Sequence, residues 1–377
     1  MSEARLELTA ELAVDGAELL DPVISPDGRL VAYVVGTADG TRGRLRTLWV
    51  APADASSPPR TLAPGPHLTG SPRWAPDSAS LVVIADRQLH RIGLDGGDPT
   101  ALTSWRGDIA GHLPLADGRL AVIATDEPDA QDERRKADGD DALVWGQDVP
   151  GHRLRLLDPV PGGLALLGEL GDRHVVEVAQ RPDGGPLAVI SWACPQDEPG
   201  ALTATLHLID PDTGKTAELS PVGLDARSPA WWHDGGCWHV AYLAVTPPGL
   251  VGGLAVFDIT VPAPRAAAQA RSPADPPNPT VAEPSNLTVA EPRNLTVGLD
   301  VCPDALAQVA SGPPLALFAD GLDTALYRLD PGPNRFRRVS ARPGRLDHLT
   351  VSASGETIAV RASSARSPTP RRSARRC

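Results

Sequence analysis

The stretch of sequence that decides the fold is Asp21-Pro22-Val23-Ile24-Ser25-Pro26-Asp27-Gly28-Arg29-Leu30-Val31-Ala32-Tyr33-Val34-Val35. An Asp-Gly pair stands here between two largely apolar runs, and that arrangement is a strong short-range signal for a tight β-hairpin. We expect a type I′ turn, whose two central residues need a positive φ. The stretch therefore predicts a strand, a turn and a second strand.

The same unit returns along most of the chain. Counted from Asp27, the turn residues follow at intervals of 50, 40, 66 and 51 residues, at Asp77, Asp117, Asp183 and Asp234. Two more hairpins are expected at Ser311-Gly312-Pro313 and Ser352-Ala353-Ser354-Gly355. Repeats of roughly 40 to 50 residues built from strands indicate propeller blades, each with four strands. The sequence therefore predicts an all-β fold, a seven-bladed β-propeller whose last blade is incomplete.

Changes in composition divide the chain into three parts. Residues 1–20 are expected to be a lead-in, either a short helix or an extended segment, and residues 21–363 the propeller. Residues 364–377 are rich in Arg, Ser and Pro, so we expect a disordered tail and no outer strands for the last blade.

Two insertions interrupt the repeats. The range 262–295 is rich in Pro, Ala and Arg without apolar periodicity, and we expect a flexible loop in the fifth blade. Within it the octad 280–287 returns as 288–295 with Arg293 in place of Ser285, which we interpret as a duplication that lengthened the loop. The polar insertion 126–141 in the third blade is either a solvated face or a functional loop.

Composition bounds the classes of function. The 377 residues carry a formal net charge of −12, so the body of the chain lacks the positive charge of a nucleic-acid-binding protein. No apolar run reaches the roughly 18 residues of a membrane helix, and no secretory signal is recognised at Met1. We therefore expect a cytoplasmic protein without nucleic-acid or membrane partners. The four cysteines form no C-x-x-C pair, so we expect no zinc site and no disulfide framework.

No catalytic constellation is recognisable. The sequence has no G-x-S-x-G, no H-E-x-x-H, no P-loop and no G-x-G-x-x-G after a strand, and its nine histidines show no ligand spacing. We therefore predict no catalytic residue, no metal and no cofactor, and assign no substrate-binding residue. The tryptophans could stack against a ligand, but beside such turns they more often pack between sheets. Seven of the eight tryptophans are meant: Trp74, Trp105, Trp145, Trp192, Trp231, Trp232 and Trp238.

Four stretches carry a family resemblance. They are Asp21–Val35, Asp126-Glu127-Pro128 through Val144-Trp145-Gly146, Phe318-Ala319-Asp320-Gly321, and Arg345-Leu346-Asp347-His348-Leu349-Thr350-Val351-Ser352. Over about residues 10 to 363 the chain resembles the propeller repeats of TolB-like proteins and of the prolyl oligopeptidase (S9) family of serine peptidases. Within that family it is most similar to the acylaminoacyl-peptidase-like branch.

The resemblance implies a function that this chain would share with a second domain. In the family a seven-bladed propeller precedes an α/β-hydrolase domain with the Ser, Asp and His of the triad, and the propeller admits only short or unstructured peptides. This sequence stops inside the last blade, so no catalytic position of the family has a counterpart here. We expect a substrate-gating propeller portion of a serine peptidase, inactive alone. The alternative is a stand-alone propeller that binds proteins or ligands, or, less in keeping with the resemblance, a propeller enzyme such as a lactonase.

Overall fold

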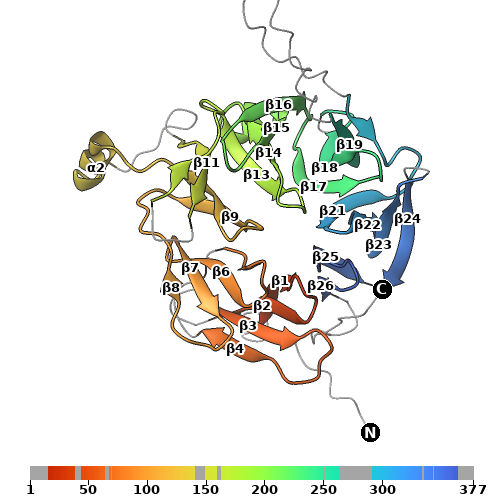
Figure 1. Ribbon diagram of the computed structural model, residues 1–377, viewed down its shortest axis with the longest axis horizontal. Coiled ribbons are helices and arrows are strands. Elements are labelled where there is room, and N and C mark those ends of the chain that lie inside the picture. The colour runs from red at the N-terminus through yellow and green to blue at the C-terminus, as the bar shows by residue number, and fades with distance from the viewer. Residues whose placement is uncertain are drawn as a thin grey trace, which may run out of the picture.

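The computed structural model describes residues 16–38, 44–63, 68, 70–140, 149–158, 163–249, 251–262, 291–332, 335–342 and 344–363. Their strands form antiparallel sheets arranged in a ring, as Figure 1 shows. Six sheets have four strands each and a further sheet has two. The fold is therefore an all-β propeller, with little helix.

Each four-stranded sheet is built from consecutive strands, and its first strand is the innermost of the ring. The first three sheets contain β1 (Glu18–Ile24), β2 (Leu30–Ala38), β3 (Arg44–Pro52) and β4 (Arg60–Ala63); β5 (Arg73–Trp74), β6 (Ser80–Ala85), β7 (Gln88–Gly93) and β8 (Thr100–Ala101); β9 (Ile109–Pro114), β10 (Leu120–Thr125), β11 (His152–Leu157) and β12 (Ala165–Leu166).

The next three sheets contain β13 (His174–Gln180), β14 (Leu187–Trp192), β15 (Thr205–Ile209) and β16 (Thr216–Pro221); β17 (Arg227–His233), β18 (Trp238–Thr246), β19 (Gly253–Val261) and β20 (Arg293–Asn294); β21 (Cys302–Val309), β22 (Gly312–Asp320), β23 (Asp323–Asp330) and β24 (Arg335–Arg342). The two-stranded sheet pairs β25 (Arg345–Val351) with β26 (Ile358–Ser363). The expected count of seven blades is thus not confirmed, since the described residues complete only six.

The repeated Asp residues lie where the sequence placed them, between the first and second strand of a sheet, but the expected type I′ turn is wrong. Gly28 N donates to Ser25 O at 2.9 Å, and Gly28, with a φ of 74°, is the residue of this turn with a positive φ. Pro26 is a central residue of the turn, and its ring fixes φ near −65°, which excludes type I′. A pair of positive φ angles occurs instead at Asp86 and Arg87, between β6 and β7.

The Asp side chain fixes each of these turns. Asp27 Oδ1 accepts the N–H two residues further on at 3.0 Å, and Asp77, Asp117 and Asp183 make the equivalent bond at 2.9 to 3.0 Å. Asp234 accepts two N–H groups, from Gly236 and Cys237, in a loop of different shape. The four turns therefore share the same side-chain hydrogen bond as well as the same Asp residue.

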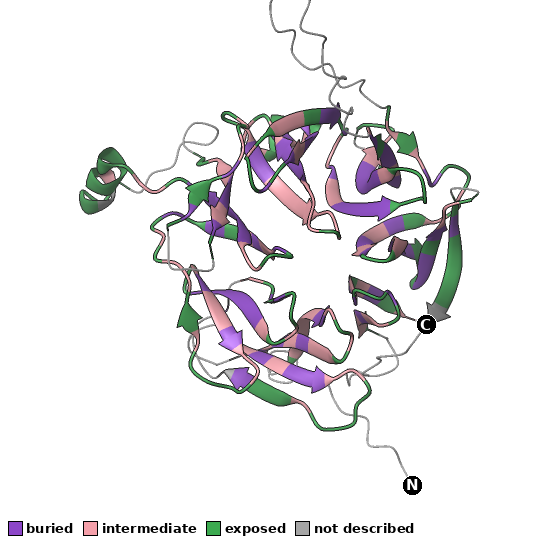
Figure 2. Cartoon of the chain, viewed as in Figure 1, coloured by how far each residue is buried: buried purple, intermediate pink, exposed green. Residues whose placement is uncertain are grey.

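Tryptophans pack between neighbouring sheets, which confirms the packing role predicted for Trp74, Trp231 and Trp232. Trp74 Nε1 donates to Val23 O of the preceding sheet at 3.0 Å, and Trp231 Nε1 donates to Ala179 O at 3.1 Å. The indole thus fills the gap between sheets and satisfies its own N–H. Figure 2 shows the buried residues concentrated within the sheets.

The ring closes through contacts of the two-stranded sheet. β25 packs against β21 on one side and β1 on the other, and β26 also packs against β1. Ala353 N donates to Pro26 O at 2.9 Å across this junction. No described strand of the first sheet pairs with β25 or β26, so side chains and turns hold the closure rather than a shared sheet.

The insertions contain more structure than the sequence suggested. The polar insertion of the third sheet contains helix α2 (Ala130–Ala137), which Asp129 caps by accepting the N–H groups of Gln131 and Asp132. Strand β20 lies inside the range 262–295 that we expected to be a flexible loop. Residues 263–290 with the first octad, residues 1–15, the motif Val144-Trp145-Gly146 and the tail 364–377 lie outside the described residues.

Candidate functional site

The innermost strands are irregular at their centres. Six of them, all except the two-residue β5, lose register with their neighbour through a bulge. In three of these bulges a residue other than glycine has a positive φ: Asp21 (48°), Ser228 (55°) and His348 (52°). Bulges re-aim side chains, and strained residues of this kind are often found at functional sites. The irregular inner strands are therefore the candidate location of a functional site.

A cluster of charges lies on these strands and in the turn that precedes β17. We call Asp21, Arg73, Glu177, Asp225, Arg227 and His348 the axial cluster. Arg73 on β5 interacts electrostatically with Asp21 on β1 and Glu177 on β13. Glu177 Oε2 accepts the N–H of Ser228 on β17 at 2.6 Å. These strands belong to the first, second, fourth and fifth sheets, so their side chains can meet only around the axis of the ring.

Burial and the neighbouring charges act on the pKa values of Arg73 and Glu177. The side chain of Arg73 is exposed, yet the surrounding protein lowers its pKa, against the opposing effect of Glu177 and Asp21. Burial raises the pKa of Glu177, and the Ser228 N–H, Arg73 and Arg227 counteract that rise. Arg73 is therefore an exposed charge on an inner strand that interacts with carboxylates of two other inner strands.

Further members of the cluster join the first sheet to the two-stranded sheet. His348 Nδ1 on β25 lies 3.4 Å from Asp21 Oδ1 on β1. Nearby, Arg361 donates to both carboxylate oxygens of Asp347 at 2.7 and 2.9 Å, a bidentate pair. The axial cluster therefore includes groups from the first sheet and from the two-stranded sheet, and it depends on ring closure.

A second polar network lies inside the fifth sheet. The carboxylate of Asp258, 2% exposed, accepts from Trp232 Nε1 at 2.9 Å and Arg293 Nη2 at 3.0 Å, and its Oδ2 lies 3.1 Å from His239 Nδ1. Burial lowers the pKa of His239, but the neighbouring carboxylates of Asp258 and Asp234 outweigh it and raise the pKa. Because the carboxylate is closed off from solvent, we interpret this network as the anchor of strand β20.

One serine and one histidine come within hydrogen-bond distance, a pair that no motif in the sequence indicates. Ser191 Oγ lies 3.0 Å from His207 Nε2. Ser191 is fully buried, however, and its oxygen accepts from Arg173 Nε at 2.7 Å. Burial and Arg173 lower the pKa of His207 to about 4, and no described carboxylate pairs with its ring. Without access, a basic histidine or an orienting carboxylate, this pair lacks the features of an activated nucleophile.

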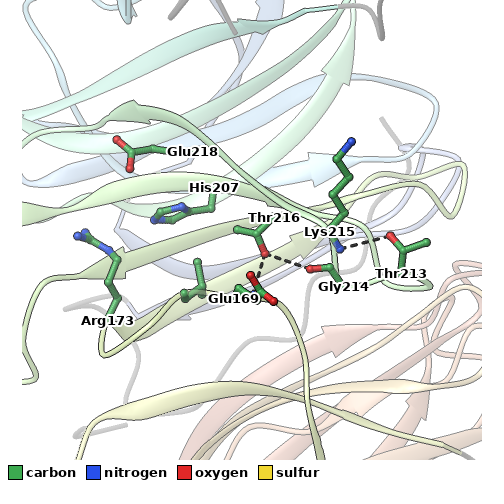
Figure 3. A pocket seen from close by; sticks show the side chains of 9 residues that line it. Glu169, Arg173, His207, Thr213, Gly214, Lys215, Thr216 and Glu218 are labelled. Carbon is green, nitrogen blue, oxygen red and sulfur yellow. Dashed lines mark hydrogen bonds between the residues drawn. The ribbon is translucent and has the colours of Figure 1, made fainter. Parts of the chain in front are cut away.

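The same histidine lies at a hollow on the flank of the ring, which we call the flank hollow. It encloses about 600 Å³ between the segment after β12 and the β15–β16 hairpin, as Figure 3 shows. Its lining consists of Glu169, Leu170, Arg173, His207, Thr213, Gly214, Lys215, Thr216 and Glu218. The hollow is polar, and it is separate from the axial cluster.

Other kinds of site are not seen in the described ranges. Within them no three His, Cys, Asp or Glu side chains group as metal ligands would. Nor does any helix there have the length and apolar character needed to cross a bilayer.

Comparison with known proteins points to peptidases. No family model matches the chain. A stretch of 142 residues is 28% identical to an uncharacterized peptidase, YuxL, of Bacillus subtilis, covering 35% of this chain and 21% of that protein. A dipeptidyl-peptidase 5 of Porphyromonas endodontalis is 29% identical over 124 residues, 32% of this chain and 18% of that protein.

Solved structures decide which part of a peptidase is matched. A puromycin-hydrolyzing peptidase of Mycobacterium tuberculosis superposes with a TM-score of 0.64 at 15% identity, covering 93% of this chain and 50% of that one. The chain is similar to the propeller half of a serine peptidase. A Pyrococcus horikoshii acylaminoacyl peptidase agrees, with a TM-score of 0.62 at 12% identity and coverage of 93% and 50%.

These neighbours confirm the resemblance to propellers of prolyl oligopeptidase family peptidases. The chain spans about half the length of the solved peptidases it matches. The described residues account for a propeller and for no hydrolase domain.

Proposed function

We propose that this propeller controls which peptides reach an α/β-hydrolase domain that cuts them, and that its channel selects them. The observation that carries the proposal is the axial cluster, in which the exposed side chain of Arg73 interacts electrostatically with Asp21 and Glu177 on two other inner strands. A narrow charged passage admits extended short peptides and excludes folded chains, because a folded domain is far wider than one strand.

The proposal assigns the parts of the chain as follows. Sheet β25–β26 is the inner half of a seventh blade, which its contacts with β21 and β1 support. Residues 21–363 are the propeller, between a lead-in and a tail. The location is cytoplasmic, and the free thiols of Cys194, Cys237 and Cys302 are what a reducing compartment would preserve.

The test blocks the channel in a protein that contains both domains. The chain is joined to the hydrolase domain of a similar peptidase, with all four native cysteines (Cys194, Cys237, Cys302 and Cys377) replaced by Ser, and Arg73→Cys is labelled with a bulky maleimide. We expect turnover of acyl-dipeptide substrates to fall on labelling, while label at Glu356→Cys, on an exposed turn, leaves turnover unchanged. Equal turnover with and without the label at position 73 contradicts the proposal.

A further inference from the structure

The flank hollow contains charges that the protein itself does not neutralise. The guanidinium of Arg173 makes four hydrogen bonds, all to neutral acceptors: Ser191 Oγ at 2.7 Å, Ser191 O at 3.1 Å, and Thr203 O and Thr205 Oγ1 at 2.8 Å. No carboxylate of the described residues forms an ion pair with it. The side chain is therefore held in one orientation with its charge available.

Two neighbouring arginines differ from Arg173, because carboxylates of the chain pair with them. Arg153 pairs with Asp172 at 3.1 Å, and Arg119 pairs with Asp117 at 2.6 Å and with Asp212 at 2.5 Å. Arg173 lacks such a pair among the described residues, and it lines the flank hollow.

Three further charged side chains lie at the edge of the hollow. Glu169, Glu218 and Lys215 are exposed at its edge, and in the described part of the chain none of them forms an ion pair. Figure 3 shows Glu218 and Arg173 on either side of His207, with Glu169 nearer to Thr216. Since His207 is neutral above pH 4, the hollow presents two positive and two negative charges around a neutral floor.

We propose that the flank hollow binds short zwitterionic peptides of about dipeptide size, with the peptide carboxylate on Arg173 and its ammonium group at Glu169 and Glu218. A charge-assisted bond from guanidinium to carboxylate is among the stronger polar contacts. A ligand with charges of both signs matches the hollow, whereas an anion alone would be repelled by the two carboxylates. The volume lies within the range of roughly 300 to 1,000 Å³ typical of small-molecule sites.

The test uses four ligands that differ only in end charge: Ala-Ala, N-acetyl-Ala-Ala, Ala-Ala-amide and N-acetyl-Ala-Ala-amide. Binding to the whole chain is followed by calorimetry and by the NMR signal of the His207 ring. We expect Ala-Ala to bind best, and each cap to weaken binding by roughly tenfold. A bound carboxylate should also raise the pKa of His207 above about 4, because it offsets the charge of Arg173.

Variants separate the two ends of the ligand. With Glu169→Gln/Glu218→Gln the acetyl cap should cease to matter, and with Arg173→Gln the amide cap should cease to matter. The exposed Glu356→Gln is the matched control and should bind like the parent chain. Arg173 also supports three residues, so circular dichroism checks that its variant folds, and the double glutamate variant tests the proposal without that risk.

Three results would overturn the proposal: equal binding of the fully capped dipeptide, no saturable shift of His207 with Ala-Ala, or binding of inorganic phosphate as tight as that of Ala-Ala. The last would indicate a simple anion site. Because none of these assays requires a hydrolase domain, failure here leaves the proposed gating function untouched.

Discussion

The hydroxyl of Thr350 joins the last sheet to Ile24 in the first, across 326 residues of sequence. Thr350 Oγ1 accepts the N–H of Ile24 at 3.1 Å and donates to Pro22 O at 3.2 Å. Thr350→Val keeps the shape of the side chain but leaves both backbone groups unpaired. We expect a loss of about 1 to 3 kcal/mol in the free energy of unfolding, measured with urea.

The control for this closure contact is Thr350→Ser, which retains the hydroxyl. It should recover most of the lost stability. A valine variant as stable as the serine variant would show that this bond does not contribute to closing the ring.

Arg293 is predicted to hold the outer strand of the fifth sheet. Arg293→Ser gives the second octad the sequence of the first and removes the ion pair with the buried carboxylate of Asp258. Arg293 is 48% exposed, so we expect a modest loss of about 1 to 2 kcal/mol. Arg345→Ser, which removes a longer exposed pair to Asp304 at 3.8 Å, is the control and should cost less. Equal melting temperatures for both variants would contradict the anchoring role.

Acid should destabilise the fold through its buried histidines. Burial lowers the pKa of His112 to about 3, and of His174 and His207 to about 4, so each stays neutral in the fold while the unfolded chain takes up a proton below about pH 6.5. The contribution of these three histidines to the free energy of unfolding is therefore fully present above pH 6.5 and falls as the pH drops from 6.5 toward 4. His239, whose pKa is raised, acts with the opposite sign above pH 6.5.

The measurement for this prediction is the urea midpoint at several pH values. His207→Gln should flatten the decline between pH 6.5 and 4, because it removes one of the three groups. An unchanged slope in that variant would count against His207 as a source of acid sensitivity.

Replacing Arg73 should change the pKa values of two residues on other inner strands. Arg73 lowers the pKa of both Glu177 on β13 and His112 on β9. Arg73→Gln should therefore raise both pKa values, as read by carboxyl and imidazole NMR titration. Arg60→Gln is the control. Arg60 lies on β4, at the opposite edge of the first sheet from the inner strand β1, so this variant should change neither pKa value. If Arg73→Gln left the pKa of Glu177 unchanged, the two groups would not share a channel.

The sequence predicted the parts of the fold that depend on local chemistry. Asp27, Asp77, Asp117 and Asp183 mark real hairpins because a carboxylate two residues before an N–H fixes the turn wherever it occurs. The predicted type I′ turn is wrong, because Pro26 fixes a negative φ at a central position of the turn. The resemblance to peptidase propellers was also recognisable, because it rests on these same repeats.

The site and the shortest strands were not predictable in the same way. Strands β12 and β20 have two residues each, too few to show a period. Asp21, Arg73 and Glu177 lie on three different sheets, and only ring closure brings them together. Helix α2 lacks an apolar face, so the capping residue Asp129 was its one readable signal.

The central claim is that this propeller admits peptides to a separate hydrolase domain. The direct measurement is turnover of acyl-peptide and aminoacyl chromogenic substrates by the purified chain, alone and joined to the hydrolase domain of a similar peptidase, with a serine-directed phosphonate as label. The account predicts no turnover and no labelling for the chain alone, and turnover with one labelled serine in the hydrolase domain after joining. Saturable turnover by the chain alone, with stoichiometric labelling of one of its own serines, would contradict it.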